Sequence, residues 1–591
     1  MKTWIVFVFV WLVGMAWGQS LNPNQKAAEE LYFQVQDRRI ACQKPVVKDG
    51  KVDKAAIPAA IKVLLEIEQD LKSPRAAELG KSYKWLTWKV HDIYRDLIQL
   101  NLLLGDEAAA ADVAKRYDQT IENSTGETRQ VFLQNINFAF DILNPVPEFA
   151  AAMKKNGAFA QQMKKLRARD GFGGVLNGNA FASPYKPNLS NEEKIAGLAQ
   201  FWSMVKYNFV FLDKIDFDWN QVMIEYTPKV LKTKSTLEYY RVLQELCARL
   251  KDAHTNISFP EQAVKDTMSG RPPIRFEVID GEVVVMKIFS EKIKDIAVGD
   301  VLEKVDGVPV MEYGEKKLGK YVETSTPQHR ELAIYNSFLL SGPPKKPVKV
   351  TMRRADGTQK VVTLAREGYG EAKGDPDYDF VVRADGIAYC RFFTCTDDSL
   401  VGKLKADLEK NPGIKGLIID LRYNGGGNSG VGAAIVEGLS TVSVKIPNTT
   451  YQTRVYSGTW MAWGRLHQLQ PTDNESWTLE PAAKRWYEGP CALLIGPRTF
   501  SAAEDWTGYW RACKIGPVIG MPTGGSTGQP IVFALPGGGS ARVCTKRDLL
   551  PDGTEFVGFG IKPDIQVPKT LKGIRAGRDE QLERAVAEIS R

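Results

Sequence analysis

The spacing of apolar positions changes along the chain and separates regions of different expected structure. From about residue 22 to residue 165, apolar side chains recur every three or four residues, which indicates amphipathic helices. The expected helices are Ala55–Leu71, Tyr83–Leu104, Glu107–Arg116, Glu127–Leu143 and Phe149–Leu166. Strand-like alternation is nearly absent, so residues 22–170 are expected to form an all-α domain, followed by a linker at Gly171–Pro187.

A second helical region is expected at residues 189–260. Ser190 gives a strong N-cap signal because acidic residues follow it in the first turn. Three aromatic-rich helices are expected at Gly197–Tyr207, Trp219–Val230 and Leu237–Leu250. This helical cap ends in the stretch Asp252-Ala253-His254-Thr255.

The period changes to that of strands between about residues 272 and 366. Strands are expected at Gly281–Ile288, Gly299–Pro309, Pro347–Met352 and Gln359–Leu364. The phrase Gly299-Asp300-Val-Leu-x-x-Val-Asp306-Gly307 resembles a turn of PDZ-like domains. The resemblance implies a PDZ-like domain over residues 270–366, with Gly270–Phe276 in the place of the carboxylate-binding loop. Such domains add an extended peptide to a sheet edge.

Strands and helices alternate from Ala384 onward, which favours an α/β core over residues 376–570. The expected strands are Gly386–Phe393, Lys415–Leu421, Cys491–Ile495, Pro517–Gly520, Ile531–Leu535 and Ala541–Thr545. Helices are expected at Asp397–Lys410 and Ser429–Leu439, and residues 571–591 form a charged C-terminal helix. The expected fold class is therefore multidomain, with α+β and α/β parts.

Length and charge narrow the function classes. A chain of 591 residues is too long for one core, so three or four domains are expected. The net charge of +8 is spread along the chain, and no nucleic-acid motif is present, so no nucleic-acid partner is expected. Residues 1–18 have the positive start, apolar run and small-residue end of a cleaved signal peptide. An uncleaved membrane anchor is the alternative; with cleavage, the protein is secreted or periplasmic, without stable membrane insertion.

Cysteine and histidine usage gives no sign of a metal site. The seven cysteines are scattered and are expected to be mostly buried small hydrophobes, with at most one or two disulfides. No Cys/His spacing suggests zinc, and no metal or organic cofactor is expected. With four histidines in the chain, the candidates for a catalytic imidazole are few.

The stretch Cys491–Trp510 contains a serine at a strand-to-helix turn. A short apolar strand ends at Gly496, and Ser501 follows where a helix N-cap is expected, with Glu504 completing a capping box. Ser501 therefore has two readings. It can cap the helix, or it can be a nucleophile whose developing oxyanion is bound by the N–H groups of the helix N-terminus.

A glycine-rich loop follows the buried strand that ends near Asp420. Its three consecutive glycines, Gly425–Gly427, present bare backbone N–H groups. A phosphate loop is disfavoured because no Gly-Lys-Ser/Thr finish is present. A structural turn and an oxyanion-binding loop both remain open.

Several motifs occur in one order along the chain. They are Asp252-Ala-His254-Thr255, Asp420-Leu-Arg422-x-Asn424-x-Gly426-Gly427, Thr499-Phe-Ser501-Ala-Ala-Glu504, Gly520-x-x-Thr523-Gly524-Gly525 and Gly558-x-Gly560-Ile-x-Pro563-Asp564. Together they resemble the C-terminal processing peptidases and their tricorn-like relatives, a serine peptidase family. The resemblance covers about Leu189 to Lys569. It implies a catalytic core of the crotonase-like ββα type.

The resemblance assigns roles to individual residues. The Ser–Lys style of the family is excluded, because Gly525-Ser526-Thr527-Gly528 lacks the lysine. The tricorn-like style implies Ser501 as nucleophile and His254 as general base, since a neutral imidazole suits that task. It also implies an oxyanion hole made by the N–H of Ala502 and a glycine N–H of Gly425–Gly426. Gly525 and Ser526 are expected to contribute to substrate binding.

The third catalytic residue departs from the family pattern. The family's glutamate falls where this chain has Val557, Gly558 and Phe559, so Glu555 or Asp552 would have to serve from a shifted loop, or the role is lost. The implied function is a secreted serine peptidase acting on peptides or proteins, including near their C-termini. A catalytically inactive peptide or hydrophobic-ligand carrier on the same scaffold is the alternative, and an assembly or adaptor role of the N-terminal helices is a third. A homo-oligomer remains open.

Overall fold

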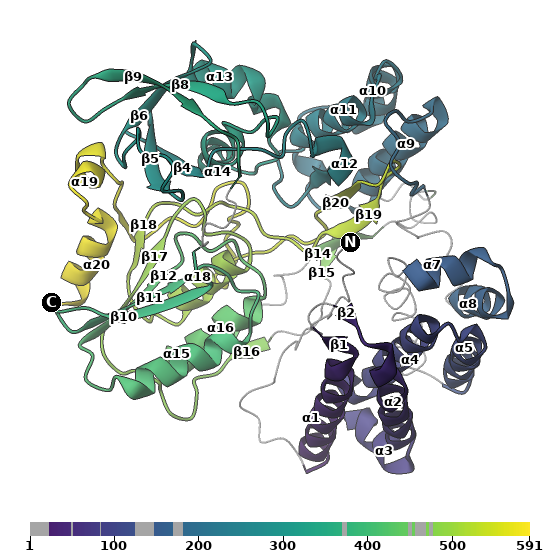
Figure 1. The fold of residues 1–591 in the computed structure, drawn as a ribbon. Coiled ribbons are helices and arrows are strands. Elements are labelled where there is room, and N and C mark those ends of the chain that lie inside the picture. The colour runs from purple at the N-terminus through teal and green to yellow at the C-terminus, as the bar shows by residue number, and fades with distance from the viewer. Residues whose placement is uncertain are drawn as a thin grey trace. The chain divides into compact units, whose positions relative to one another are not determined.

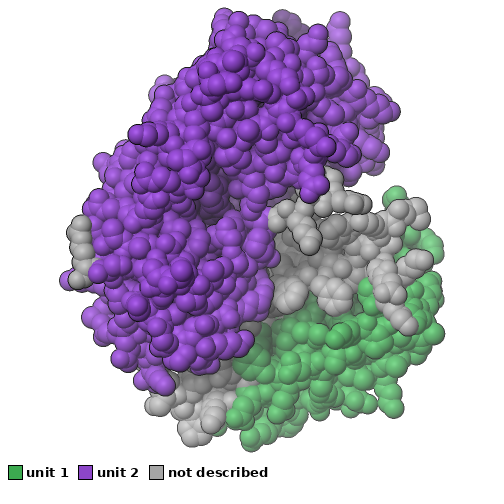
Figure 2. Space-filling view, turned by 60° about the vertical axis from the view of Figure 1, so that its left-hand side comes forward, with its two compact units in different colours: residues 1–177 green, residues 178–591 purple. Residues whose placement is uncertain are grey.

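The computed structural model describes residues 23–48, 51–82, 84–124, 147–168, 181–368, 375–446, 452–455, 462, 468–471 and 477–590. The chain divides into two compact units, residues 1–177 and residues 178–591 (Figure 2). The expected signal peptide at residues 1–18 and the expected helix Glu127–Leu143 lie outside the described residues.

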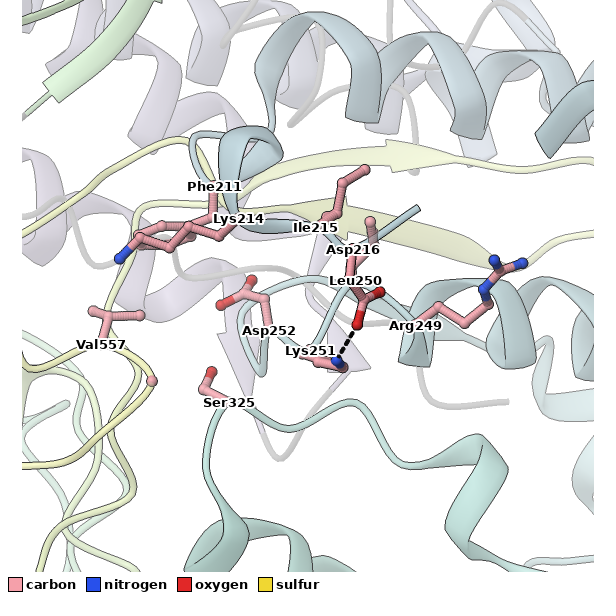
Figure 3. Close-up of a pocket in the computed structure, with 11 residues that line it drawn as sticks. Phe211, Lys214, Ile215, Asp216, Arg249, Leu250, Lys251, Asp252, Ser325 and Val557 are labelled. Atoms are coloured by element: carbon pink, nitrogen blue, oxygen red, sulfur yellow. Dashed lines mark hydrogen bonds and ion pairs between the residues drawn. The ribbon is translucent and has the colours of Figure 1, made fainter. Parts of the chain in front are cut away.

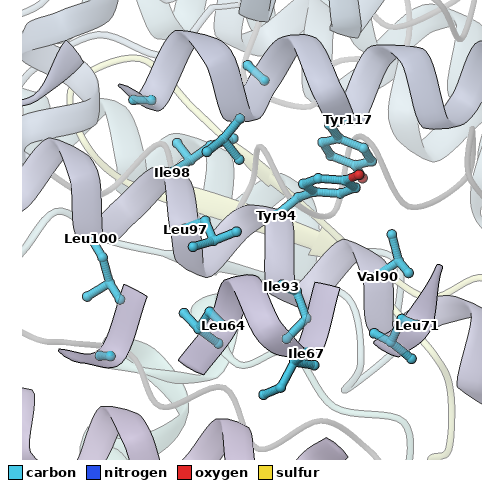
Figure 4. Packing of buried hydrophobic residues seen from close by; sticks show 14 of the residues in the cluster. Leu64, Ile67, Leu71, Val90, Ile93, Tyr94, Leu97, Ile98, Leu100 and Tyr117 are labelled. Atoms are coloured by element: carbon cyan, nitrogen blue, oxygen red, sulfur yellow. The ribbon is translucent and has the colours of Figure 1, made fainter. Parts of the chain in front are cut away.

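The first unit is built from helices. They are α1 (Pro23–Gln43), α2 (Ile57–Leu71), α3 (Pro74–Ser82), α4 (Lys84–Leu104), α5 (Glu107–Glu122), α7 (Pro147–Lys154) and α8 (Ala158–Ala168). Buried residues of α2 and α4, among them Leu64, Ile67, Ile93 and Leu97, belong to one core cluster (Figure 4). The sequence prediction of an N-terminal helical region is confirmed, and a short hairpin of β1 (Val47–Lys48) and β2 (Lys51–Val52) is added to it.

The single helix expected over Phe149–Leu166 is wrong, because the structure has two helices there. α7 ends at Lys154 and α8 begins at Ala158. Asn156 between them has a φ of 51°, a left-handed conformation that no helix interior contains. Gly157 follows and adds backbone freedom, so the apolar period continues in sequence while the helix breaks.

A cluster of charged side chains lies inside the first unit. The Arg39 guanidinium donates to Asp96 at 2.6 Å and to Asp92 at 3.3 Å. Arg95 donates to Asp96 at 3.0 Å, and Lys89 donates to Asp92 at 3.1 Å. All five residues are buried. Each carboxylate therefore has two or more cationic partners, as burial of charge requires.

The second unit begins with the expected helical cap. Its helices are α9 (Asn191–Asn208), α10 (Val222–Leu231), α11 (Thr236–Ala248) and α12 (Glu261–Val264). Ser190 and Glu193 form the capping box of α9. A short strand, β3 (Asn256–Ser258), follows the turn that contains His254.

Residues 270–366 form an antiparallel sheet with two short helices (Figure 1). Its strands are β4 (Ile274–Ile279), β5 (Glu282–Ile288), β6 (Val301–Val305), β7 (Val308–Pro309), β8 (Val348–Arg353) and β9 (Gln359–Leu364), and its helices are α13 (Val310–Lys317) and α14 (Pro327–Leu332). The expectation of a loop over Gly270–Phe276 is wrong in its second half, because Ile274 and Phe276 bury alternate side chains as part of β4. The carbonyl of Phe276 accepts a hydrogen bond from the Asn336 side chain at 2.5 Å, so that part of the β4 edge is already occupied.

The α/β core is a six-stranded sheet with helices on both faces (Figure 1). In order across the sheet the strands are β10 (Tyr378–Val382), β11 (Ile387–Phe392), β12 (Gly416–Asp420), β17 (Cys491–Ile495), β18 (Val518–Gly520) and β21 (Ile565–Gln566). All neighbours are parallel except β10 and β11. Helices α15 (Ser399–Lys410), α16 (Ser429–Leu439) and α18 (Ala502–Ala512) belong to one core cluster with the sheet, while α20 (Glu580–Ile589) contributes to a separate cluster.

One hairpin of the core leaves the main sheet. β19 (Ile531–Ala534) and β20 (Ser540–Val543) pair with each other, and β20 pairs with β3 of the cap. The strand after His254 is therefore part of a sheet with the core. Two small hairpins, β13 (Val444–Ile446) with β16 (Trp477–Leu479) and β14 (Gln452–Val455) with β15 (Gln468–Pro471), complete the described strands.

Three further expectations can be compared with the structure. The C-terminal segment is two helices, α19 (Leu571–Arg575) and α20, because Gly577 between them has a φ of 68°. All seven cysteines are described, none is in a disulfide, and all except Cys42 are buried. Across the described ranges, no helix has both the length and the apolar character that a membrane span requires.

Candidate active site

Ser501 lies where a buried parallel strand turns into a buried helix. β17 ends at Ile495, and α18 begins at Ala502. Ser501 has φ 55° and ψ −125°, a conformation that costs a non-glycine residue about 1–3 kcal/mol. Surrounding contacts hold it there: the Phe500 N–H donates to the Asn424 carbonyl at 3.1 Å, and the Ser501 N–H donates to the Ser526 carbonyl at 3.1 Å. Backbone strain of this kind clusters at functional sites.

His254 is brought to Ser501 by the small sheet that joins the cap to the core. β3 pairs with β20, and the Cys544 N–H donates to the Thr255 hydroxyl at 3.0 Å. The Nε2 atom of His254 lies 3.1 Å from the Ser501 Oγ. The imidazole stacks on the Phe500 ring, with 4.9 Å between centroids and 2° between planes. The ring is therefore fixed in position and orientation.

The other imidazole nitrogen faces a buried polar chain. Nδ1 of His254 lies 2.8 Å from the Ser526 Oγ, and that hydroxyl lies 3.4 Å from Oδ1 of Asp252. An ionised carboxylate accepts hydrogen bonds and donates none. With Asp252 ionised, the Ser526 hydroxyl donates to Asp252 and accepts from Nδ1–H. That direction leaves the lone pair of Nε2 toward the Ser501 hydroxyl.

Burial keeps the His254 imidazole neutral. Burial, together with the positive charges of Arg542 and Lys546, lowers the pKa of His254 to about 3. Burial also raises the pKa of Asp252, while hydrogen bonds from Thr255, the His254 N–H and Ser526 lower it. At neutral pH the imidazole is thus neutral, and its Nε2 is able to accept a hydrogen bond from the Ser501 hydroxyl.

Glu504 binds the loops around Ser501 together. Its carboxylate accepts from the Thr523 hydroxyl at 2.5 Å and from the N–H groups of Gly525 at 2.8 Å, Ser526 at 3.0 Å and Ser501 at 3.2 Å. The side chain is fully buried. Burial raises the pKa of Glu504 to about 8 against the lowering effect of these four hydrogen bonds. Glu504 is thus more than a helix cap, since it fixes both Ser501 and the turn that carries Ser526.

The glycine loop lies directly against the start of α18. Gly426 has a φ of 94°, and a Cβ there would be 2.6 Å from the Phe500 carbonyl oxygen and 2.9 Å from the Ala502 nitrogen. Only glycine allows this approach. The Gly426 N–H already donates to the Asn424 side chain at 2.8 Å. Of the two glycine donors expected from the sequence, Gly425 is therefore the one better placed for a ligand.

Two sets of expected site residues have contacts other than those that the resemblance implies. Glu555 accepts from Lys214 and from Arg547, both at 2.7 Å, so its carboxylate is neutralised in ion pairs and Nδ1 of His254 faces Ser526 instead. Asp552 accepts from the Thr554 N–H in an exposed turn. Gly525 and Ser526 were expected to bind substrate. Both are buried, and the Ser526 hydroxyl contacts the His254 imidazole.

Four residues around the imidazole could not be given these contacts from the sequence. Asp252 stood in a recognised motif, but nothing showed that it reaches Ser526. Phe500 stacks on His254 on one side, and the ring of His329 lies 4.9 Å from Phe500 as well. The pKa of His329 is lowered to about 4 by burial, so this second imidazole is also neutral. The sequence contains a weak signal for Ser526, because it lies in the turn where peptidases of the Ser–Lys style have their lysine.

A cavity of about 170 Å³ lies behind Asp252 (Figure 3). The cap, Ser325 and the Val557–Gly558 segment line it, and the Asp252 carboxylate points into it. Its cations are paired: Lys251 with Asp216 at 2.7 Å and Lys214 with Glu555 at 2.7 Å. No group of three or more potential metal ligands occurs among the residues that the structure describes.

Two models of known protein families match parts of this chain. The family model "Peptidase family S41" matches residues 386–567, and the "Tricorn protease C1 domain" model matches residues 192–248. Residues 386–567 belong to peptidase family S41. The two matches confirm the relationship to tricorn-like C-terminal processing peptidases that was recognised from the sequence motifs, and they support a serine peptidase.

Solved structures agree with the S41 assignment at the level of the fold. Mature CPAF complexed with lactacystin is 16% identical, with a TM-score of 0.53, and the match covers 67% of this chain and 97% of that chain. Mature CPAF is also 16% identical, with a TM-score of 0.52 and coverage of 65% and 94%. No curated protein matches this chain. The mixed helix-and-sheet architecture with an N-terminal helical region and an S41-like core is confirmed.

Proposed function

We propose that this chain hydrolyses peptide bonds with Ser501 as the nucleophile and His254 as the general base. The observation that carries the proposal is the 3.1 Å approach of a neutral, buried imidazole Nε2 to the Ser501 Oγ. A serine hydroxyl is a weak nucleophile until an adjacent base removes its proton. The strained backbone of Ser501 and the stacking of His254 on Phe500 support this role, because both fix the pair in one geometry.

The chemical steps follow from the positions of the donors. Ser501 Oγ attacks the scissile carbonyl carbon while its proton passes to Nε2 of His254. The oxyanion that forms receives hydrogen bonds from the N–H groups of Gly425 and Ala502, each contributing about 3 kcal/mol to transition-state stabilisation. The imidazolium then protonates the leaving amine, and a water deprotonated by Nε2 hydrolyses the acyl-enzyme.

Asp252 and Ser526 are positioning residues in this proposal. Nδ1–H donates to the Ser526 hydroxyl, and that hydroxyl donates to Asp252, so the unprotonated nitrogen is the one beside Ser501. When His254 becomes an imidazolium, its charge lies one hydroxyl away from the Asp252 carboxylate. The pair thus fills the role for which Glu555 was expected.

The finer features of the function are proposals of the same kind. Secretion or a periplasmic location follows from the signal-peptide pattern at residues 1–18. Substrates are unfolded proteins or peptides, with cleavage that includes positions near C-termini. The sheet of residues 270–366 is PDZ-like and holds a substrate tail. A homo-oligomer is compatible with all of these.

Hydrolysis of denatured casein tests the proposal. Wild type is compared with Ser501→Ala and His254→Ala, and with matched controls at an exposed serine, Ser399→Ala, and at a histidine of the other unit, His91→Ala. We expect both site variants to lose activity by about 10³-fold or more, because the residual rate comes from binding and the oxyanion donors alone. Full activity of both site variants would make the assignment wrong.

Labelling with a fluorophosphonate separates this proposal from a catalytically inactive carrier. A peptidase with an activated Ser501 forms a covalent adduct at that residue, which peptide mass spectrometry locates. The adduct should be absent in Ser501→Ala and strongly reduced in His254→Ala. A folded wild-type protein that takes no label would favour the carrier.

A further inference from the structure

One segment of the residue 270–366 sheet region contacts the loops of the site at several points. Segment 323–329 runs up to and into α14. Ser325 Oγ accepts from the Ala253 N–H at 3.0 Å, next to His254. Thr326 Oγ1 donates to the Gly524 carbonyl at 2.8 Å, next to the turn that carries Ser526. The same segment therefore contacts the residue before His254 and the loop that leads to Ser526.

Gln328 makes the contact that joins the most loops. Its Nε2 donates to the Thr523 carbonyl at 2.8 Å and to the Phe559 carbonyl at 3.0 Å. Both acceptors are carbonyl oxygens, so the amide must present its NH₂ group to them. One side chain thus ties the Thr523 turn to the loop before β21.

The contact with Thr523 leads directly to the nucleophile. The Thr523 hydroxyl donates to Glu504 at 2.5 Å, and Glu504 accepts from the N–H groups of Ser501 and Ser526. A shift of Thr523 moves the acceptor that fixes both of these backbone groups. Small displacements matter here, since a misplacement of 1 Å can cost a reaction about 100-fold.

We propose that segment 323–329 is a positioning element of the catalytic site, with Gln328 as the residue that holds the Thr523–Ser526 turn in the reactive geometry. The sheet of residues 270–366 then has a task besides any peptide binding: it completes the site that the cap and the core form. The inference rests on the proposed peptidase function of Ser501 and His254, but its structural part can be measured without turnover.

The segment itself is rigid enough for this task. Thr326 is 3% exposed and its hydroxyl also accepts from the His329 N–H at 3.2 Å, which caps α14. The His329 ring lies 4.9 Å from Phe500, on which His254 stacks. α14 continues into a helical turn, Ala333–Phe338, whose Ala333, Ile334 and Tyr335 are buried in the core of the sheet region. The positioning contacts therefore originate from a packed core.

The test replaces Gln328 by Met, which keeps the length and loses both donated hydrogen bonds. The matched control is Gln359→Met in the same sheet region, where the amide donates to Glu303 at 2.7 Å on the surface. We expect Gln328→Met to lower kcat about tenfold to 100-fold with KM within twofold of wild type, because positioning acts on the chemical step. Gln359→Met should change neither constant.

A second readout does not depend on activity. Hydrogen exchange measured by mass spectrometry on peptides that cover Gly524–Ser526 should become faster in Gln328→Met and stay unchanged in Gln359→Met. Gln328→Glu, which cannot donate from its carboxylate, should reproduce both effects and guards against a folding artefact of the Met variant. Unchanged exchange together with unchanged kcat would overturn the inference. An inactive wild type with faster exchange in the Gln328 variants would instead refute the proposed function and keep the positioning role.

Discussion

His91 in the helical unit and His254 in the catalytic unit are both buried imidazoles whose pKa is lowered to about 3 by burial. Their surroundings differ. His91 contacts the phenol of Tyr117, and the Tyr117 ring stacks on that of Tyr94. His254 contacts two hydroxyls, one on each nitrogen. A lowered pKa therefore does not distinguish a structural histidine from a base, whereas the two-sided hydroxyl contact does.

The carboxylates of the two regions differ in the same way. Asp96 accepts from the guanidinium groups of Arg39 and Arg95, so its charge is compensated where it is buried. Asp252 accepts instead from neutral hydroxyls, among them that of Ser526. The Asp96 carboxylate, whose charge is neutralised by two guanidinium groups, stabilises the fold around it. The Asp252 carboxylate, which is bound to a neutral hydroxyl, is able to stabilise a positive charge that forms on His254. Four sets of substitutions test this difference between the two regions, and they follow from the largest expected effect to the smallest.

The largest effect is expected for Asp252→Asn. An asparagine amide can donate to Ser526, whose hydroxyl then donates to Nδ1 of His254 and leaves the proton on Nε2. This tautomer cannot accept from Ser501, so kcat should fall by about 10³ to 10⁴, the scale seen when a triad carboxylate is lost. The measurement is steady-state hydrolysis with the melting temperature as control. An active Asp252→Asn enzyme would show that Asp252 does not set the tautomer.

Asp96→Ala is the matching change in the helical unit. It leaves the buried Arg39 without its closest carboxylate, so the unfolding free energy of residues 1–177 should fall by about 3–5 kcal/mol. Chemical denaturation followed by hydrogen exchange on peptides of α1 and α4 measures it. At temperatures where the unit remains folded, kcat should be unchanged. A loss of kcat without a loss of stability would contradict the division of roles between the two clusters.

The pH dependence of stability sharpens the comparison of the histidines. Each imidazole binds a proton in the unfolded chain below its ordinary pKa of 6.5, but in the folded protein only below about 3. Each histidine therefore lowers the free energy of unfolding as the pH decreases from 6.5 toward 3. At pH 5 the loss is about 2 kcal/mol per histidine. His91→Gln should flatten this acid dependence in the helical unit and His254→Ala in the catalytic unit. Identical pH slopes in wild type and variants would contradict burial of neutral imidazoles.

Ser526→Ala should have the smallest of these effects. The imidazole keeps its stacking on Phe500 but loses the hydroxyl between Nδ1 and Asp252, so kcat should fall about tenfold. The neighbouring Thr527, whose hydroxyl donates to Asp548 at 3.0 Å, supplies the control Thr527→Val. Ser526→Thr, which retains a hydroxyl, should recover part of the loss. Equal effects of the Ser526 and Thr527 variants would indicate a packing defect instead of a broken hydrogen-bond chain.

Local sequence signals located the regular elements well. β17 at Cys491–Ile495 and α16 at Ser429–Leu439 have the bounds expected from apolar runs and caps. Elements without such a signal were missed, among them β10, which pairs with the following strand β11, and β3, whose partner β20 comes from a distant part of the sequence. A three-residue strand such as Asn256–Ser258 forms because β20 is there to pair with it, and no local pattern records that.

The candidate site was predictable only in part for the same reason. Ser501 and His254 could be named from motifs, although 247 residues separate them along the chain. Ser526 and Asp252 could not be linked to the imidazole, because their hydrogen bonds depend on how the cap and the core pack. Glu555 had the right charge and an acceptable position in sequence, but Lys214 and Arg547 neutralise it.

The most direct test of the account is the protonation of His254, measured by ¹⁵N NMR of the ring nitrogens in protein labelled at histidine. The chain has four histidines, so His254→Ala assigns the signal. We predict a neutral ring at pH 7 with the proton on Nδ1 and a bare Nε2, converting to the other tautomer in Asp252→Asn. A proton on Nε2 in the wild-type protein, or a positively charged ring, would contradict the proposal that His254 accepts the proton of Ser501.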